Sequence, residues 1–358
     1  MSYGGEVVDR LTAWLRVQLP DTDNLRLEGL DRVEFGHSAE MIVLTIVSSA
    51  DSRDVVIRLR PPPPALLEPY DLAKQFTVLR ALEGSAVRVP RALWLDDTGD
   101  VLGRPFFVME RMPGTVYELE APSEPEVSAA AVTRMCHSMA EQLAAIHTVD
   151  IAAANLESLA DGRNHLDREI GHWSLEMQRV KRGTLPALER LLRELTESQP
   201  APSAAVTLVH GDAKPGNFAF VGGEVSAVFD WELTTVGDPM TDIGYLELLW
   251  RMPVGIPSHE AAPAIDDVIA HYATASGLTI ANREWYRAFN AFKLAVINLI
   301  GSRLFDDGAT DDQRFMLNAY GIPLFTQMGL AELGVAEKLD DGPVMPSEER
   351  MKQAQAAH

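Results

Sequence analysis

Three carboxylates and one amide lie within a short segment of the chain, at a spacing suited to magnesium and phosphate chemistry. Asp212 ends the triplet His-Gly-Asp, Asn217 comes five residues later, and Asp230 opens the triplet Asp-Trp-Glu. Kinase-type phosphoryl transfer needs an acidic residue at the acceptor hydroxyl. It also needs an Asn and an Asp whose hard oxygens hold Mg²⁺ against the phosphates. We therefore predict Asp212 as the catalytic residue and Asn217 and Asp230 as metal ligands.

The elements around this segment are predicted to bring the two ligands together. Runs of β-branched and other apolar residues, typical of strands, occupy 206–209, 218–221 and 225–229. Gly222-Gly223, between the last two runs, allows positive φ at both positions of a two-residue turn. A hairpin about this turn would return Asp230 to the loop that holds Asp212 and Asn217.

The segment resembles the aminoglycoside phosphotransferase family, whose fold is similar to that of protein kinases. The family pattern is HGDxxxxN, then a strand ending in DWE, then GDPxxD. It is matched at His210, Gly211, Asp212, Asn217, Asp230, Trp231, Glu232, Gly237, Asp238, Pro239 and Asp242. Weaker similarities lie at 61–64, 89–90, 106–114, 143–147, 162–163, Arg168 and Trp173. Together they resemble a set of actinobacterial phosphotransferases and a subgroup that also occurs joined to acyl-CoA dehydrogenases.

The resemblance implies an α+β, bilobal, protein-kinase-like fold. Its small N-terminal lobe would hold a five-stranded antiparallel sheet and one helix, and its larger C-terminal lobe would be mostly helical. The implied cofactors are ATP or GTP and Mg²⁺, and the implied acceptor is a hydroxyl group of a small molecule. In the family, the position of His210 braces the catalytic loop. The position of Asp242 accepts hydrogen bonds from that loop's backbone, so both residues are expected to be structural supports.

The composition of the chain indicates which cellular compartment and which partners are expected. The 358 residues, 46% of them hydrophobic, leave enough apolar surface for two cores. A single cysteine, Cys136, fits a reducing cytoplasm, and no signal peptide or membrane span is expected. The net charge of −21 argues against a nucleic-acid partner. The same charge would suit a cationic acceptor, or it serves only to keep the chain soluble. The oligomeric state is left open.

Local patterns divide the chain into three parts. Residues 1–112 are predicted to form the nucleotide-binding lobe, with helices at 6–18 and 71–83 and strands at 32–35, 41–47, 55–60, 87–95 and 104–112. Met112-Pro113-Gly114 is the expected hinge. Residues 113–335 form the predicted catalytic and acceptor-binding lobe, with one apolar stripe at 132–146 and helices at 166–182, 185–197, 240–251, 262–275 and 283–304. The polar tail, 336–358, is expected to be loosely ordered.

The predicted nucleotide site departs from the kinase pattern at two positions. Alternation along the strand places Val56 and Arg58 on one face, with Val56 over the base. Arg58 takes the position of the kinase lysine that touches the phosphates, and Arg is not a neutral replacement for Lys. The usual helix glutamate is replaced by Gln75, so an Arg–Gln hydrogen bond is expected instead of an ion pair.

Three further residues complete the predicted nucleotide site. Ser38 belongs to the loop 35–40, which has one glycine where the kinase pattern has three, and Ser38 could reach a phosphate. Backbone groups of Glu110 and Met112 are expected to form hydrogen bonds with the purine of the nucleotide. Trp231 is expected to pack between elements, and Glu232 is either a third acidic group at the site or a surface residue. There is no GxxxxGK[ST] sequence, which excludes a P-loop mechanism.

The acceptor stays open between an aminoglycoside and a hydroxylated metabolite, such as a hydroxy acid or its thioester. Clustered Asp and Glu side chains in the pocket would favour a polycation, whereas an apolar channel with a basic mouth would favour an acyl compound. Aromatic candidates for the pocket wall are Trp173, Trp250, Trp285 and Tyr286. A second reading, motivated by Arg58 and Gln75, is a nucleotide-binding, kinase-like protein with little or no transferase activity.

Overall fold

The chain folds into two compact units. The computed structural model describes residues 5–19, 23–33, 40–49, 51–123, 127–160, 162–337, 339–347 and 350–351. The N-terminal unit comprises Met1–Thr115, Ala219–Val221 and Val225–Glu232. The helical unit comprises Val116–Phe218, Gly222–Glu224 and Leu233–His358. The polypeptide therefore passes between the units several times around the strands that carry the predicted site.

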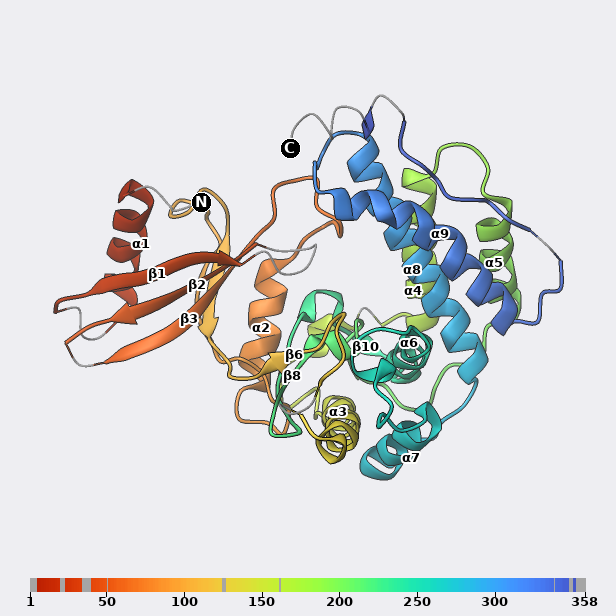
Figure 1. Ribbon diagram of the computed structural model, residues 1–358, viewed down its shortest axis with the longest axis horizontal. Helices are drawn as coiled ribbons and strands as arrows, with labels where there is room; N and C mark the ends of the chain where they lie inside the picture. The colour runs from red at the N-terminus through yellow and green to blue at the C-terminus, as the bar shows by residue number, and fades with distance from the viewer. Residues whose placement is uncertain are drawn as a thin grey trace. The chain divides into compact units, whose positions relative to one another are not determined.

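The N-terminal unit is built on the expected five-stranded antiparallel sheet (Figure 1). Its order is β1-β2-β3-β5-β4, with bounds β1 Arg26–Val33, β2 Glu40–Val47, β3 Ser52–Leu59, β4 Ala92–Asp96 and β5 Phe106–Glu110. β1 begins six residues earlier than predicted. β4 begins five residues later, at Ala92, because Pro90 has no backbone N–H to add to the ladder.

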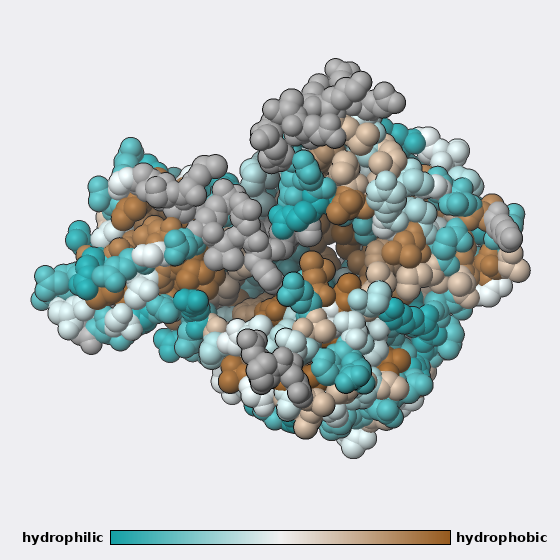
Figure 2. All heavy atoms as spheres, viewed as in Figure 1, coloured by the Kyte–Doolittle hydropathy of each residue, from teal (hydrophilic) through white to brown (hydrophobic). Residues whose placement is uncertain are grey.

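Two helices belong to the N-terminal unit. α1 (Gly5–Gln18) buries Leu11 and Leu15 against alternate residues of the sheet, including Ile42 and Val55. Figure 2 shows hydrophobic residues between hydrophilic ones over β1 to β3. α2 (Leu72–Leu82) starts at Asp71, whose carboxylate accepts a hydrogen bond from the N–H of the third following residue at 2.8 Å. Such an N-cap satisfies one of the free donors at the helix start.

The helical unit is organised around α8 (Arg283–Asp306), which contacts α4, α5, α6 and α9. The helices are α3 Ala129–His147, α4 His165–Val180, α5 Pro186–Glu197, α6 Met240–Trp250, α7 Ile265–Ser276, α8 and α9 Gln313–Glu332. In this unit, β7 Thr207–Val209 pairs with β10 Thr235–Gly237. A further sheet is formed by the short strands β6 Thr115–Val116, β8 Phe218–Val221 and β9 Glu224–Val228. α8 is long and apolar enough to cross a membrane, but 78% of its apolar stretch is buried in the structure, as in a core helix.

α9 is the helix that sequence patterns did not predict. It runs beside α8 (Figure 1) and contains Pro323. A proline removes one backbone donor and normally ends or kinks a helix. Burial of Phe315, Ile322 and Leu330 against the rest of the unit compensates for that lost hydrogen bond.

The polar tail, expected to be loosely ordered, makes specific contacts where the structure describes it. The Asp341 carboxylate accepts hydrogen bonds at 2.9 Å from the N–H groups of Ala187 and Leu188, at the start of α5. The residue before α5 is a leucine without a side-chain cap, so Asp341 supplies that cap from a distance. Arg350 is buried and donates to the carbonyl oxygen of Phe305 at 2.7 Å.

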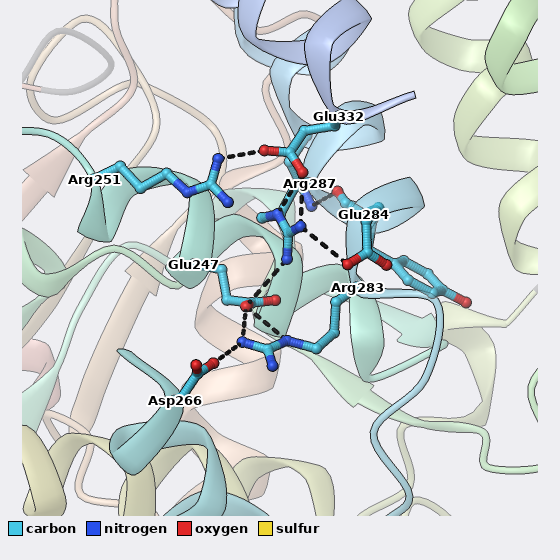
Figure 3. Close-up of polar contacts among 9 residues, drawn as sticks. Glu247, Arg251, Asp266, Arg283, Glu284, Arg287 and Glu332 are labelled. Atoms are coloured by element: carbon cyan, nitrogen blue, oxygen red, sulfur yellow. Dashed lines mark hydrogen bonds and ion pairs between the residues drawn. The ribbon is translucent and has the colours of Figure 1, made fainter. Parts of the chain in front are cut away.

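A buried charge network ties α6, α8 and α9 together (Figure 3). Arg287 lies 3.3 Å from the Glu247 carboxylate and 2.7 Å from the Glu332 carboxylate. Arg283 also pairs with Glu247, and Arg251 with Glu332. The side chains of Arg287, Glu247 and Glu332 are 8%, 2% and 9% exposed. Buried charges are tolerated when they are paired, so this network fixes how the three helices pack.

Replacing Arg287 should therefore destabilise the helical unit. Arg287→Met should lower the free energy of unfolding by about 3 kcal/mol, because two buried carboxylates lose their shared partner. Urea unfolding followed by helical circular dichroism measures this change. Arg182→Met removes an ion pair on a side chain that is 54% exposed and should change stability by less than about 1 kcal/mol. Equal losses in both variants would contradict the structural role of the network.

Candidate active site

The loop between β7 and β8 is held by a buried carboxylate from α6. Asp242 is fully buried and accepts hydrogen bonds from the backbone N–H groups of His210, at 2.7 Å, and Gly211, at 2.8 Å. Gly211 has φ +85°, and a Cβ there would lie 2.4 Å from the carbonyl oxygen of Leu233. Only glycine fits such a position. The geometry gives Asp242 the position that the family resemblance implied.

A histidine and a tyrosine hold Asp242 in turn. His147, at the end of α3, bonds through Nε2 to the Asp242 carboxylate at 2.9 Å and through Nδ1 to the Tyr272 hydroxyl at 2.6 Å. Burial alone would raise the pKa of Asp242, but the hydrogen bond and charge of His147, with the N–H of Gly211, lower it. No role for His147 is predicted from the sequence. Its place at the end of an apolar helical stripe was the available signal.

Asn217 is bound to Asp212 in a way that leaves one atom for a metal. The Asn217 amide nitrogen donates to the backbone carbonyl of Asp212 and to its carboxylate, both at 2.7 Å. Its amide oxygen is then the atom that can act as a ligand. The N–H of Asp212 donates to Nδ1 of the buried His210 at 3.2 Å, consistent with a bracing role.

Two lysines flank Asp212, and neither was predicted. Burial would raise the pKa of Asp212, but Lys214, a hydrogen bond from Tyr245, His210 and Lys293 lower it below its usual value. Lys293 donates to the Gly211 carbonyl and lies over the rings of Trp173, at 5.6 Å, and Tyr245, at 5.2 Å. Burial lowers the pKa of Lys293. Asp212 is therefore a half-buried, ionised carboxylate in a positively charged setting.

A mainly apolar cavity of about 250 Å³ lies within the helical unit beside this loop. Lys214, Pro215 and Gly216, which follow Asp212 in the chain, form part of its wall. Its apolar lining includes Leu119, Tyr245, Leu249, Met252, Val254 and Leu294. Its charged lining residues are Lys214 and Glu118, which form an ion pair at 2.8 Å. The cavity therefore has no net charge of its own.

The aromatic residues predicted for the pocket wall do not line this cavity. Trp173 is buried beside Lys293. Trp285 donates from Nε1 to the carbonyl of Leu195 at 3.1 Å, and the Tyr286 hydroxyl donates to the buried Asp238 at 2.6 Å. Trp250 is the last residue of α6 and is half-buried. Three of the four therefore serve the core of the unit, which is the commoner fate of aromatic residues on helices.

In the N-terminal unit, Asp230 lies at a strained turn after β9. Its φ is +63°, a left-handed conformation that is rare outside glycine and is often found at functional sites. Its carboxylate accepts a 2.7 Å hydrogen bond from Nη2 of Arg58, on β3. The next residue, Trp231, is buried and donates to the carbonyl of Val228 at 3.1 Å, so it packs as expected. Because Asn217 belongs to the helical unit, its convergence with Asp230 on one metal stays a prediction.

The expected contact between Arg58 and Gln75 is replaced by contacts to carboxylates. Arg58 pairs with Asp230 and, at 3.2 Å, with Glu232, and its Nε donates to the Tyr70 hydroxyl at 3.2 Å. Gln75 bonds to Tyr70 instead, and its amide nitrogen has no partner among the described residues. A buried guanidinium is better satisfied by a carboxylate than by a neutral amide. The Glu232 side chain is only 10% exposed, so it is not a surface residue.

The remaining predicted nucleotide contacts have mixed outcomes. Val56 lies on β3, two residues before Arg58 and on the same face of the strand. The N–H of Glu110 donates to the carbonyl of Arg91 at 2.9 Å. This N–H is therefore not available to bind a purine. Met112 follows β5 and is half-buried. Ser38 lies outside the described residues.

Comparisons with known proteins place these features in one family. A model of the "Phosphotransferase enzyme family" matches residues 39–289. "Acyl-CoA dehydrogenase family member 10" of Mus musculus is 30% identical over 258 residues, which are 68% of this chain and 24% of that protein. The chain thus spans about a quarter of the length of this curated relative.

Solved structures share the fold. A Ralstonia eutropha protein, provisionally assigned as an aminoglycoside phosphotransferase, is 25% identical with a TM-score of 0.75, covering 92% of this chain and 99% of its own. A thermostable mutant of aminoglycoside phosphotransferase APH(4)-Ia, solved with AMP-PNP and hygromycin B, is 14% identical with a TM-score of 0.64, covering 93% and 99%. The five-stranded N-terminal sheet and the mostly helical C-terminal part are thus those of a kinase-like fold.

The buried position of Asp242 predicts a pH-dependent stability effect. Asp242→Asn should lower the free energy of unfolding by about 2–3 kcal/mol at pH 7, because the loop N–H groups lose a charged acceptor. The folded-state pKa lies below the ordinary 3.8, so this contribution is present above about pH 4 and disappears as the pH falls further. Urea unfolding between pH 3 and pH 7 measures it. Exposed Glu260→Gln is the control, and a pH-independent loss in Asp242→Asn would contradict the assignment.

Proposed function

Because the chain belongs to the phosphotransferase enzyme family, we propose that it transfers the γ-phosphate of ATP or GTP, with Mg²⁺, to a hydroxyl group of a small molecule. The observation that carries this proposal is the half-buried Asp212, held ionised by its neighbours, bound by Asn217 and located beside a cavity of about 250 Å³. The AMP-PNP bound in the APH(4)-Ia structure supports a nucleotide as the phosphate donor.

Asp212 would orient the acceptor hydroxyl and take its proton. In a loose phosphoryl-transfer transition state this proton leaves late, so orientation is the main contribution. General-base assistance is typically worth roughly 10²–10⁴ in rate. The lysines near Asp212 keep its carboxylate ionised, which lets it accept a hydrogen bond from the hydroxyl.

The proposed ligands are of the types that suit a magnesium ion. The amide oxygen of Asn217 is left for a ligand because the amide nitrogen already binds Asp212. Asp230 would supply the carboxylate oxygen, and hard oxygen ligands of this kind suit Mg²⁺. When bound, the metal would neutralise phosphate charge. Arg58 would steady the phosphates with its guanidinium, which can bind two oxygens at once.

The cavity favours a hydroxylated metabolite with an apolar body over an aminoglycoside. Its lining is mainly apolar, and Glu118 is neutralised by Lys214. A polycation would lose its water there without gaining carboxylate partners. The similarity to an acyl-CoA dehydrogenase family member points in the same direction, towards a hydroxy acid or its thioester. Lys214 beside the cavity would suit the acidic end of such a compound.

A second candidate function is nucleotide binding with little or no transfer. Arg58 stands where kinases have lysine, and it pairs with Asp230, a proposed metal ligand. If this pair persists with nucleotide bound, magnesium would bind poorly and turnover would be slow. Against this reading, the chain retains every proposed acceptor and metal residue, namely Asp212, Asn217 and Asp230.

Turnover with and without the proposed catalytic residue separates the two functions. The measurement is Mg²⁺-dependent ADP release from ATP across a panel of hydroxy acids, their thioesters, amino alcohols, aminoglycosides and macrolides. An acceptor should raise turnover in the wild type, and Asp212→Asn should lose about 10²–10⁴ of that rate. Asp230→Ala should lose both the turnover and its dependence on magnesium. Clear ATP binding without turnover for any acceptor would favour the binding protein.

Narrowing the cavity should weaken binding of the acceptor and not binding of the nucleotide. Leu249→Trp enlarges a residue of the cavity wall. It should raise the KM for the acceptor by about tenfold or more, while the KM for ATP changes by less than about twofold, because one good apolar contact is worth about 1–3 kcal/mol. Leu175→Trp, on an exposed face of α4, is the matched control. An unchanged acceptor KM in Leu249→Trp would exclude this cavity as the acceptor site.

A further inference from the structure

The carboxylate partners of Arg58 come from the loop after β9 and not from α2. Nη2 of Arg58 lies 2.7 Å from Asp230 and 3.2 Å from Glu232. The side chains of Arg58 and Glu232 are only 8% and 10% exposed. α2 offers the neutral Gln75, which bonds to Tyr70. The carboxylates that pair with Arg58 therefore lie on the loop after β9, whereas the kinase pattern has its glutamate on the helix.

A buried guanidinium needs an anionic partner in every state of the enzyme. Removing the partner of a buried charge is strongly destabilising, since the remaining charge has lost its water. In the proposed function, Asp230 binds the metal when nucleotide is present, so it is no longer free to serve Arg58. Glu232 is then the carboxylate that remains for Arg58 among its observed partners.

We infer that Glu232 is a positioning residue that replaces the helix carboxylate of the kinase pattern and aims Arg58 at the phosphates; this inference rests on the proposed function. The surroundings of Glu232 support it. Lys74, on α2, donates from Nζ to the backbone carbonyl of Glu232 at 3.0 Å. The hydroxyl of Tyr70, just before α2, accepts a hydrogen bond from Nε of Arg58 at 3.2 Å.

The arrangement changes which element controls the phosphate contact. With a helix glutamate, movement of the helix makes or breaks the ion pair. Here Arg58, Glu232 and Asp230 form one cluster. Lys74 of α2 donates to the backbone carbonyl of Glu232, and Tyr70, just before α2, bonds to Arg58. The position of Arg58 is then set by the same loop that carries the proposed metal ligand, so phosphate and metal contacts are assembled together.

A double-mutant cycle on Arg58 and Glu232 tests this role. The measurements are the Kd for AMP-PNP, the KM for ATP, kcat, and the Mg²⁺ concentration that gives half-maximal rate, in Arg58→Gln, Glu232→Gln and the double variant. Glu232→Gln should raise the KM and the Kd by about tenfold, which is about 1.4 kcal/mol. The double variant should be no more than about twofold worse than Arg58→Gln, because residues that act through one contact are not additive. The half-maximal Mg²⁺ concentration should not move in Glu232→Gln.

Two results would overturn the inference. Multiplicative effects in the double variant, together with a raised Mg²⁺ requirement in Glu232→Gln, would make Glu232 a metal ligand. Wild-type affinity in Glu232→Gln would leave it without a role. Glu83→Gln, which breaks an exposed pair in the same unit, is the matched control. Glu232→Asp, which keeps the charge and should recover part of the affinity, replaces Glu232→Gln if that variant does not fold. A wild type that binds no AMP-PNP would refute the proposed function instead.

Discussion

A single buried carboxylate, Asp242, is the constraint on which the helical part of the site depends. An ionised group without water must be surrounded by donors, and here these come from the catalytic-loop backbone and from His147. Three elements, α3, α6 and the loop after β7, are thereby joined at one point. Gly211 adopts the positive φ of this loop, and its N–H bonds to Asp242. The orientation of Asp212 follows from this loop shape.

Buried ion pairs extend the same logic to the rest of the chain. Arg287 joins two carboxylates from α6 and α9, and Arg58 joins two from the loop after β9. In both cases the partners are far apart in sequence, so the pairs form only when the tertiary structure is in place. Such pairs add little net stability compared with apolar packing, but they penalise any other arrangement of the elements. They are well suited to hold a site in one geometry.

This distance in sequence also explains what could be predicted. The motif from His210 to Asp242 and the alternating strands are local signals, and they were enough for the fold, the sheet and the proposed chemistry. Lys293 and His147 lie on helices as single polar residues in apolar runs, and nothing local tells which buried group they meet. α9 was missed because Pro323 is a local signal for a break, which burial of the helix overrides. The pairing of Arg58 with Glu232 likewise depends on tertiary contacts.

The cavity and the charges around Asp212 together indicate how an acceptor would be chosen. Lys214 is paired with Glu118, and Lys293 is directed at a carbonyl and two rings, so neither lysine is a bare charge. An entering group must compete with Glu118 for Lys214, which an anion can do and a cation cannot. Apolar walls then favour a carbon chain over a hydrated sugar, since each buried CH₂ gains about 0.8 kcal/mol. Selectivity for the acceptor would thus arise in two ways: the carbon chain of the acceptor is desolvated by the apolar walls, and its anionic group replaces Glu118 at Lys214. Asp212 would contact only the hydroxyl.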